Sequence, residues 1–184
     1  MTSAEEERYF KALDAELMGA QREVQAARAS RDALAGVVGS NDEVVLADLT
    51  ALGFTANTAS LVPLLPLLQV AWSEGHVTAE EREVILSLAR ERGIVPESIA
   101  DTQLLSWLSD RPHDATFQSG LQVLARIFAT RPSGASSVIL DELFGNCARV
   151  AAASGGFMGL TSNTSSRETR VIDRIKQVLL DANP

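Results

Sequence analysis

The sequence predicts an all-α protein with about eight helices. Apolar residues recur at steps of three and four along the chain, which is the spacing of one helix face. No segment alternates apolar and polar residues with the β-branched and aromatic enrichment that is typical of strands. Ala and Leu dominate a composition that is 46% hydrophobic and only 5% aromatic, which favours closely packed helices.

Residues 1–39 are predicted to form a long amphipathic helix that ends near Gly36 to Gly39. Its apolar or small residues alternate steps of three and four, as in a coiled-coil heptad. They are Phe10, Leu13, Leu17, Ala20, Val24, Ala27, Leu34 and Val38, with Arg31 at the remaining position. Two interpretations stay open. Either the stripe packs on the chain's own domain, or it projects as an arm that pairs with a second copy or another protein.

A helical domain is predicted over residues 40–184. It begins with a short helix over 44–52, which an acidic turn caps at its positive end. The segment 61–72 is apolar almost all round and is predicted to be one central, buried helix. Its two prolines, Pro63 and Pro66, are expected in the first turn, where proline is tolerated.

The remaining helices are separated by turns rich in glycine, proline, serine or threonine. Asp114 is the predicted cap of one helix, while Ile99 and Val138 are expected to point inward. Trp72 and Trp107 lie at helical core spacing and are interpreted as core anchors. The predicted helices cover 78–92, 96–108, 115–130, 136–154 and 166–181, with a loop over 155–164.

The segments near 70–85 and 150–172 share one pattern. It reads Ala-x-Ser-x-Gly-x-hydrophobic, followed by Ser/Thr-x-x-Glu-x-x-Val-Ile. We interpret each copy as an apolar helix that ends at glycine and a capping box that starts the next helix. Two such helix hairpins around one core would bury both apolar helices. The residues concerned are Gly75, Thr78 and Glu81 in the first copy and Gly156, Ser165 and Glu168 in the second.

The first copy, Ala71 to Ile85, resembles the signature of the TerB-like family, Ala-x-Ala-Asp-Gly-x-hydrophobic-x-x-x-Glu-x-x-hydrophobic-hydrophobic. These are tellurite-resistance-type helical domains, also found in membrane-anchored J-domain co-chaperones. The resemblance covers residues 61–181 and implies an all-helical fold with two similar halves. The chain departs from the signature at the family's Asp, which is Glu74 in the first copy and Gly155 in the second.

The resemblance also implies a function. Proteins of this kind act through protein partners in cytoplasmic stress-response or envelope-associated assemblies, at the inner membrane through those partners. We therefore expect a non-enzymatic interaction domain whose partner the sequence does not identify. An alternative is a weak divalent-cation sensor, and a third hypothesis is an enzyme with its acids in a helical cleft.

The acidic corner is the candidate cation site, with Glu74, Glu80 and Glu81 as ligands. It is similar to the second half of an EF-hand loop, but the oxygen ligands needed at 70 and 72 are replaced by Val70 and Trp72. A weakly bound divalent cation is therefore the most that we expect, with no other cofactor. The competing interpretation is that Glu81 caps a helix while Glu74 is a solvated turn acid.

Composition argues against several other classes. The formal net charge of -8 disfavours a nucleic-acid binder, which needs a surface rich in lysine and arginine. The longest apolar run, 61–71, is too short for a transmembrane helix. A single cysteine, Cys147, excludes an intrachain disulfide, and the polar N-terminus has no secretory pattern, so we expect a cytoplasmic protein.

Nucleophile and phosphate-loop motifs are not found in the sequence, which is why no enzyme is expected. The two histidines, His76 and His113, are predicted in surface turns. Cys147 lies among apolar residues of a predicted helix and is interpreted as a core thiol.

Overall fold

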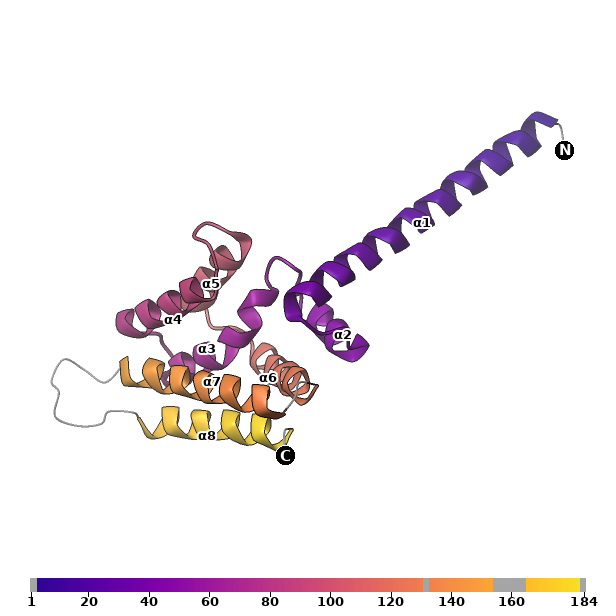
Figure 1. The fold of residues 1–184 in the computed structure, drawn as a ribbon. Coiled ribbons are helices and arrows are strands. Elements are labelled where there is room, and N and C mark those ends of the chain that lie inside the picture. Colours follow the sequence, from indigo (N-terminus) through magenta and orange to yellow (C-terminus); the bar gives the residue numbers. More distant parts are fainter. Residues whose placement is uncertain (1–2, 131–132, 154–164, 183–184) are drawn as a thin grey trace.

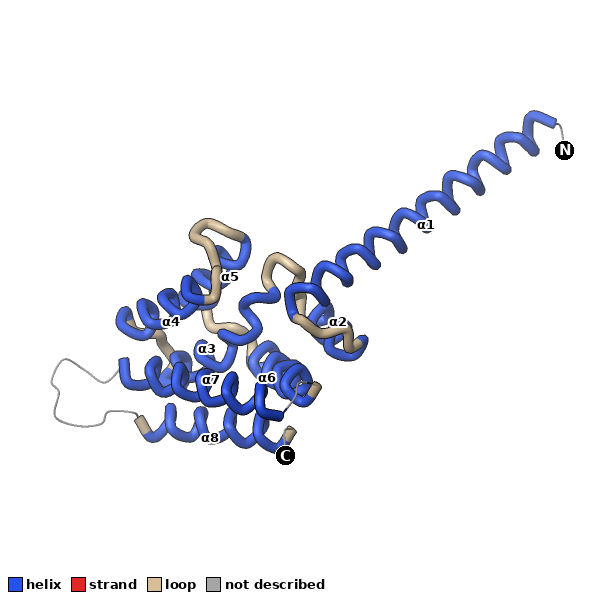
Figure 2. Tube along the Cα trace, viewed as in Figure 1, coloured by secondary structure: helices blue, strands red, loops and turns tan. Residues whose placement is uncertain are grey.

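The computed structural model describes residues 3–130, 133–153 and 165–182. Within these ranges the fold is all α, as predicted, with eight α-helices and no strands (Figure 1, Figure 2). Two short 3-10 helices, η1 and η2, lie on either side of α3. The elements are α1 Ser3–Val38, α2 Glu43–Ala51, η1 Ala59–Leu64, α3 Leu65–Ala71, η2 Trp72–Glu74, α4 Ala79–Glu91, α5 Ile99–Ser109, α6 Asp114–Ala129, α7 Ser133–Ala153 and α8 Ser166–Asp181.

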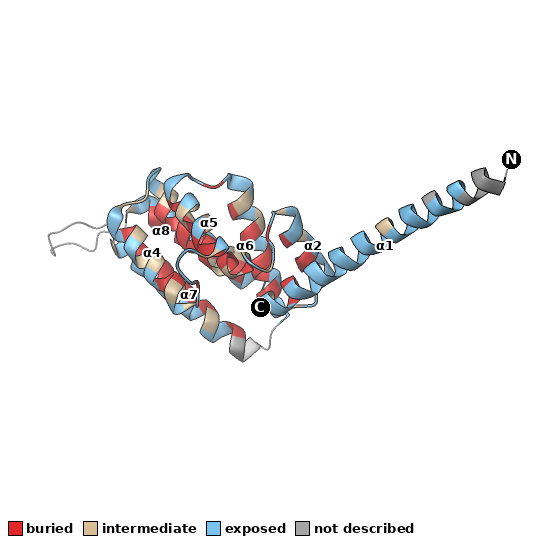
Figure 3. Cartoon of the chain, turned by 90° about the horizontal axis from the view of Figure 1, so that it is seen from above, coloured by how far each residue is buried: buried red, intermediate tan, exposed pale blue. Residues whose placement is uncertain are grey.

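The predicted long N-terminal helix is confirmed, and it projects away from the rest of the protein (Figure 1). Its apolar stripe is exposed from Phe10 to Ala27, as the pale blue of α1 in Figure 3 shows. Burial begins only at Leu34 and Ala35, close to the end of the helix. The stripe therefore contacts the chain's own domain at its base alone.

The segment predicted as one helix over 61–72 is instead divided among η1, α3 and η2. Pro63 lies inside the 3-10 helix η1, and only Pro66 lies in the first turn of the α-helix. Proline has no backbone N–H and its ring clashes with the carbonyl four residues before it. An α-helix therefore cannot run through both prolines, and α3 begins at Leu65, just before the second proline.

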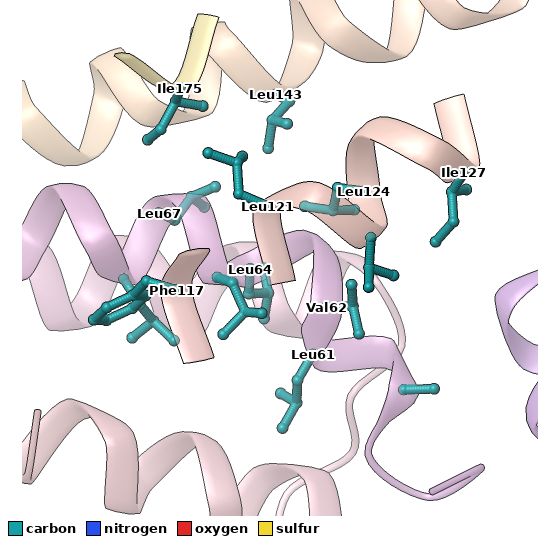
Figure 4. Close-up of a cluster of buried hydrophobic side chains, with 14 of the residues drawn as sticks. Leu61, Val62, Leu64, Leu67, Phe117, Leu121, Leu124, Ile127, Leu143 and Ile175 are labelled. Atoms are coloured by element: carbon teal, nitrogen blue, oxygen red, sulfur yellow. The ribbon is translucent and has the colours of Figure 1, made fainter. Parts of the chain in front are cut away.

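The short helix α3 is the centre of the core, because every residue in it except Gln69 is buried. Helices α6, α7 and α8 pack against α3, and α4 packs on α7. Figure 4 shows Leu67 beside Leu121 of α6, with Leu143 of α7 and Ile175 of α8 nearby. Each buried leucine of this kind contributes about 1.5–3 kcal/mol relative to an exposed one. In the described ranges, no helix is long and apolar enough to cross a membrane.

Helix α6 comes very close to α3 at Gly120, and this approach depends on the missing side chain. A Cβ atom at Gly120 would overlap Cδ1 of Leu65, which is itself buried. Leu65 has packed neighbours on its other sides, so it cannot move away freely. Glycine is therefore needed here for contact between helices rather than for an unusual backbone angle.

The predicted start and inward face of α5 are wrong in part. Ser98 caps α5, whereas Pro96 lies in the turn before it and does not open the helix. The buried residues of α5 include Leu104 and Leu108, which are four residues apart on one face. Ile99 is 61% exposed because it lies on the other side of the first turn.

Two other local predictions are wrong. Val138 is 67% exposed, because the buried face of α7 passes through Ser136 and Leu140, on the opposite side of the helix. Asp114 is not the cap of α6. His113 occupies that position without a side-chain hydrogen bond, and Asp114 lies in the first helical turn.

An ion pair between half-buried Arg90 and buried Asp101, which the sequence did not reveal, joins α4 to α5. Arg90 donates from Nη2 to Asp101 Oδ1 at 2.6 Å and from Nη1 to the carbonyl of Ile94 at 2.8 Å. The N–H of Glu97, which has a φ of +63°, donates to the other oxygen of Asp101 at 2.8 Å. The Arg90 hydrogen bond keeps the pKa of Asp101 below its ordinary value against the effect of burial, and the Glu97 N–H acts in the same direction.

We expect Gly120→Ala to destabilise the protein by about 1–3 kcal/mol, because the new methyl group overpacks the contact between α6 and α3. Gly145 is the matched control, since it lies inside α7 with open space around its missing Cβ. Gly145→Ala should leave stability unchanged or raise it by about 0.5–1 kcal/mol. Urea unfolding of both variants followed by circular dichroism measures the difference, and equal stabilities would show that α6 does not depend on this contact.

Candidate functional site

The first glycine corner joins α3 to α4 through η2. Gly75 ends η2 with a φ of +91°, and its N–H donates to the carbonyl of Trp72 at 3.1 Å. A Cβ atom disfavours this left-handed conformation, and glycine has none, which explains why glycine occupies position 75. Thr78 then adopts an extended backbone and becomes the N-cap of α4.

Thr78 and Glu81 form a complete capping box at the start of α4. The Glu81 N–H donates to Thr78 Oγ1 at 3.2 Å. In return, the N–H and the hydroxyl of Thr78 both donate to Glu81 Oε2 at 2.8 Å. Glu81 is only 2% exposed, so its carboxylate is held inside the corner.

The start of α8 repeats this arrangement. The Ser165 N–H donates to Glu168 Oε2 at 2.6 Å, and the Glu168 N–H donates to Ser165 Oγ at 3.2 Å. Glu168 is 1% exposed. The predicted turn glycine of this second copy, Gly156, lies outside the residues that the structure describes.

The electrostatic surroundings of the Glu81 carboxylate include the charge of Glu168. Burial raises the pKa of Glu81 above its ordinary value, and the hydrogen bonds from Thr78 oppose this rise. The negative charge of Glu168 raises the pKa of Glu81 further, while His76 lowers it. The two capping boxes are therefore neighbours in space, in agreement with the packing of η2 against α8. The repeated pattern predicts equivalent positions for both glutamates, but their proximity was not predicted.

The predicted cation ligands have different surroundings. Glu74 and Glu80 are exposed, at the end of η2 and in the first turn of α4, whereas Glu81 is buried in its capping box. Over residues 3–130, 133–153 and 165–182, no three His, Cys, Asp or Glu side chains are grouped so that they could hold a metal ion. His76, also in the corner, is exposed.

A second set of contacts ties the first corner to α5. The indole N–H of Trp72 donates to the carbonyl of Trp107 at 2.8 Å. The ring of Trp107 also contacts Phe54 edge to face, with 6.0 Å between ring centroids. Both tryptophans are half-buried and pack against the core. Beside them, Ser73 Oγ is buried without a hydrogen-bond partner.

The thiol of Cys147, on α7, lies in the hydrophobic core of the protein. It is fully buried, and burial raises its pKa to about 12. A thiol of this kind stays protonated at neutral pH and does not react as a nucleophile.

A groove of about 1020 Å³ opens where α1 leaves the domain. One wall belongs to the end of α1, and the other belongs to α2 and the turn that follows it. Arg31 of α1 and Glu43 of α2 form an ion pair of 2.8 Å between the two walls. The residues that line the groove include Ala27, Arg31, Leu34, Leu46, Ala47 and Phe54. The groove is formed by three segments, so no local sequence pattern indicates it.

No protein-family model, no curated protein and no solved structure matches this chain.

We expect Glu81→Gln to change how stability depends on pH. Glutamine can still accept the hydrogen bonds of a capping box, but it does not ionise. Because the pKa of Glu81 is higher in the folded state than in the unfolded chain, the folded state binds the proton more tightly. Wild-type stability should therefore fall, relative to that of the variant, as the pH rises from below the ordinary value of 4.5 through the raised pKa.

Urea unfolding of both proteins at pH 4 and pH 7 measures this difference. Glu80→Gln is the control, because it removes the same charge from an exposed residue next to Glu81. A difference between wild type and Glu81→Gln that is the same at both pH values would contradict the raised pKa.

Proposed function

We propose that the protein is a non-enzymatic interaction domain that binds other proteins through the exposed stripe of α1. The observation that carries this proposal is the position of the stripe. Apolar side chains such as Leu17 and Val24 are 55% and 52% exposed along a helix that contacts the domain only at its base. An exposed apolar surface of this length is typical of a protein contact.

The finer description of the fold belongs to the same proposal. We infer a TerB-like bundle with two pseudo-symmetric halves, one containing α3 and α4 and the other containing α7 and α8. Each half has a capping box with a buried glutamate, Glu81 in one and Glu168 in the other, which supports the relation. By its resemblance, the protein would serve a cytoplasmic stress-response or envelope-associated assembly.

Photo-crosslinking tests the role of the stripe. A photoreactive amino acid replaces Leu17, on the stripe, or Ala15, which is also exposed but lies on the other face of α1. In cells that produce the protein, position 17 should give discrete cross-linked products, while position 15 should give few or none. The products are then identified by mass spectrometry.

Similar products from both positions, or none from either, would contradict an interaction through the stripe. Circular dichroism of the two purified proteins controls for the fold, because neither position contacts the core.

A weak divalent-cation sensor is the second candidate function. The observation that favours it is the packing of η2 against α8, which brings the capping boxes of Glu81 and Glu168 near each other, since a cation between them would relieve the repulsion of two carboxylates. Against it, each carboxylate already accepts hydrogen bonds from its own N-cap residue.

Calorimetric titration with calcium and with zinc separates the two functions. We expect no binding, or dissociation constants of about 10⁻⁴ M or weaker, because two carboxylates with backbone carbonyls make a poor calcium site. Micromolar affinity that is lost in Glu74→Gln or Glu81→Gln, but kept in Glu83→Gln, would favour the cation sensor instead.

A further inference from the structure

The apolar stripe of α1 and the groove at its base are one continuous surface. Ala27, Arg31 and Leu34 line the groove and also continue the heptad positions of the exposed stripe. The far end of α1 has the aromatic residues Tyr9 and Phe10, each 60% exposed and in edge-to-face contact with the other. A helix that lies along the stripe would therefore end inside the groove.

Local features give the projecting part of α1 limited support. Arg28 and Asp32 are four residues apart, but the basic residue comes first, which is the less favourable order. Gly19 weakens the helix by about 1 kcal/mol relative to alanine. Packing of the stripe against another helix would therefore add stability to the arm.

We propose that the occupant of this surface is α1 of a second copy of the chain, in antiparallel orientation. The proposal rests on the interaction role assigned to the stripe above, and it names the partner. The same stripe would serve both copies, so the interface is closed and self-complementary. The aromatic end of each α1 would occupy the groove of the other copy.

The heptad positions define a register in which large residues meet small ones in the central layers. When Leu17 lies opposite Ala27 of the second copy, Val24 lies opposite Ala20, and the symmetry repeats both layers. In the outer layers Leu13 lies opposite Arg31, and Phe10 lies over the groove beside Leu34 of the second copy. The central alternation fills the space between the helices without overpacking it.

Charge also favours this register. Asp14 lies beside Arg28 of the second copy, and symmetry makes two such pairs. One repulsive pair remains, between Glu23 and its equivalent near the twofold axis. Two attractive pairs thus flank the seam against a single repulsive one.

The parallel orientation is disfavoured by the base of the arm. It would also give an attractive pair, Glu23 with Arg28 of the second copy, but it would place Arg31 opposite Arg31 in the seam. Helix α2 and residues 54–57 lie on the same side of α1 at that point, because they form the opposite wall of the groove. A parallel partner would run into them, whereas an antiparallel partner brings only its tip there.

Disulfide trapping tests the orientation with the full chain. Chains with Leu17→Cys and chains with Ala27→Cys, of which one carries a tag, are oxidised separately and as a mixture. The antiparallel register predicts a disulfide between the two kinds of chain in the mixture and none in either chain alone. The native Cys147 is fully buried and stays out of the reaction.

Sedimentation equilibrium tests the groove. Ala47 is exposed on the wall of the groove, so Ala47→Trp should fill it and weaken the dimer about tenfold or more. Ala148→Trp is the control, because Ala148 is an exposed helical residue of α7 that does not line the groove, and it should leave the dimer unchanged.

Three outcomes would overturn the inference. Disulfides in either chain alone would show a parallel pair, an unchanged dimer in Ala47→Trp would show that the groove is not occupied, and a monomer at all concentrations would exclude self-association. The last outcome leaves the proposed function standing if position 17 still cross-links to a different protein, and both proposals fail if it cross-links to none.

Discussion

The fold depends on the need to surround α3. This helix is apolar on all sides, so it cannot lie at a surface as an amphipathic helix does. Helices α6, α7 and α8 cover it, and Gly120 lets α6 come close enough to do so. The chain must also enter and leave α3 within a few residues. The 3-10 helix η1, which contains Pro63, leads the chain into α3. After α3, the left-handed conformation of Gly75 at the end of η2 turns the chain away.

Features that depend on residues close together in the chain could be predicted from the sequence. The all-α class and the long N-terminal helix follow from spacing alone, and the capping boxes at Thr78 and Ser165 are motifs of four residues. Errors occurred where an apolar residue was assigned to the inward face without the helical spacing to the buried residues. Ile99 is five residues before Leu104 and Val138 is two residues before Leu140, so neither shares a helix face with its buried neighbour, and both are exposed.

Features that join distant segments could not be predicted. The ion pair between Arg90 and Asp101 and the approach of Glu81 to Glu168 both depend on how helices pack, and one sequence contains no information on that pairing. The groove beside α1 is also of this kind. The repeated pattern did place the two glutamates in equivalent positions, and a twofold arrangement of the copies would have suggested that they lie near each other.

The length of α1 has a mechanical consequence. A helix of 36 residues extends for about 54 Å and bends little, unlike a glycine-rich linker of the same number of residues. Whatever binds near its tip is held at a set distance and direction from the helices at its base. In the proposed pair, two identical domains would lie at opposite ends of the paired arms at a fixed spacing. A target with two binding sites would then gain avidity only if the distance between its sites matched the distance between the two domains. The arm would therefore set this distance in addition to forming the contact.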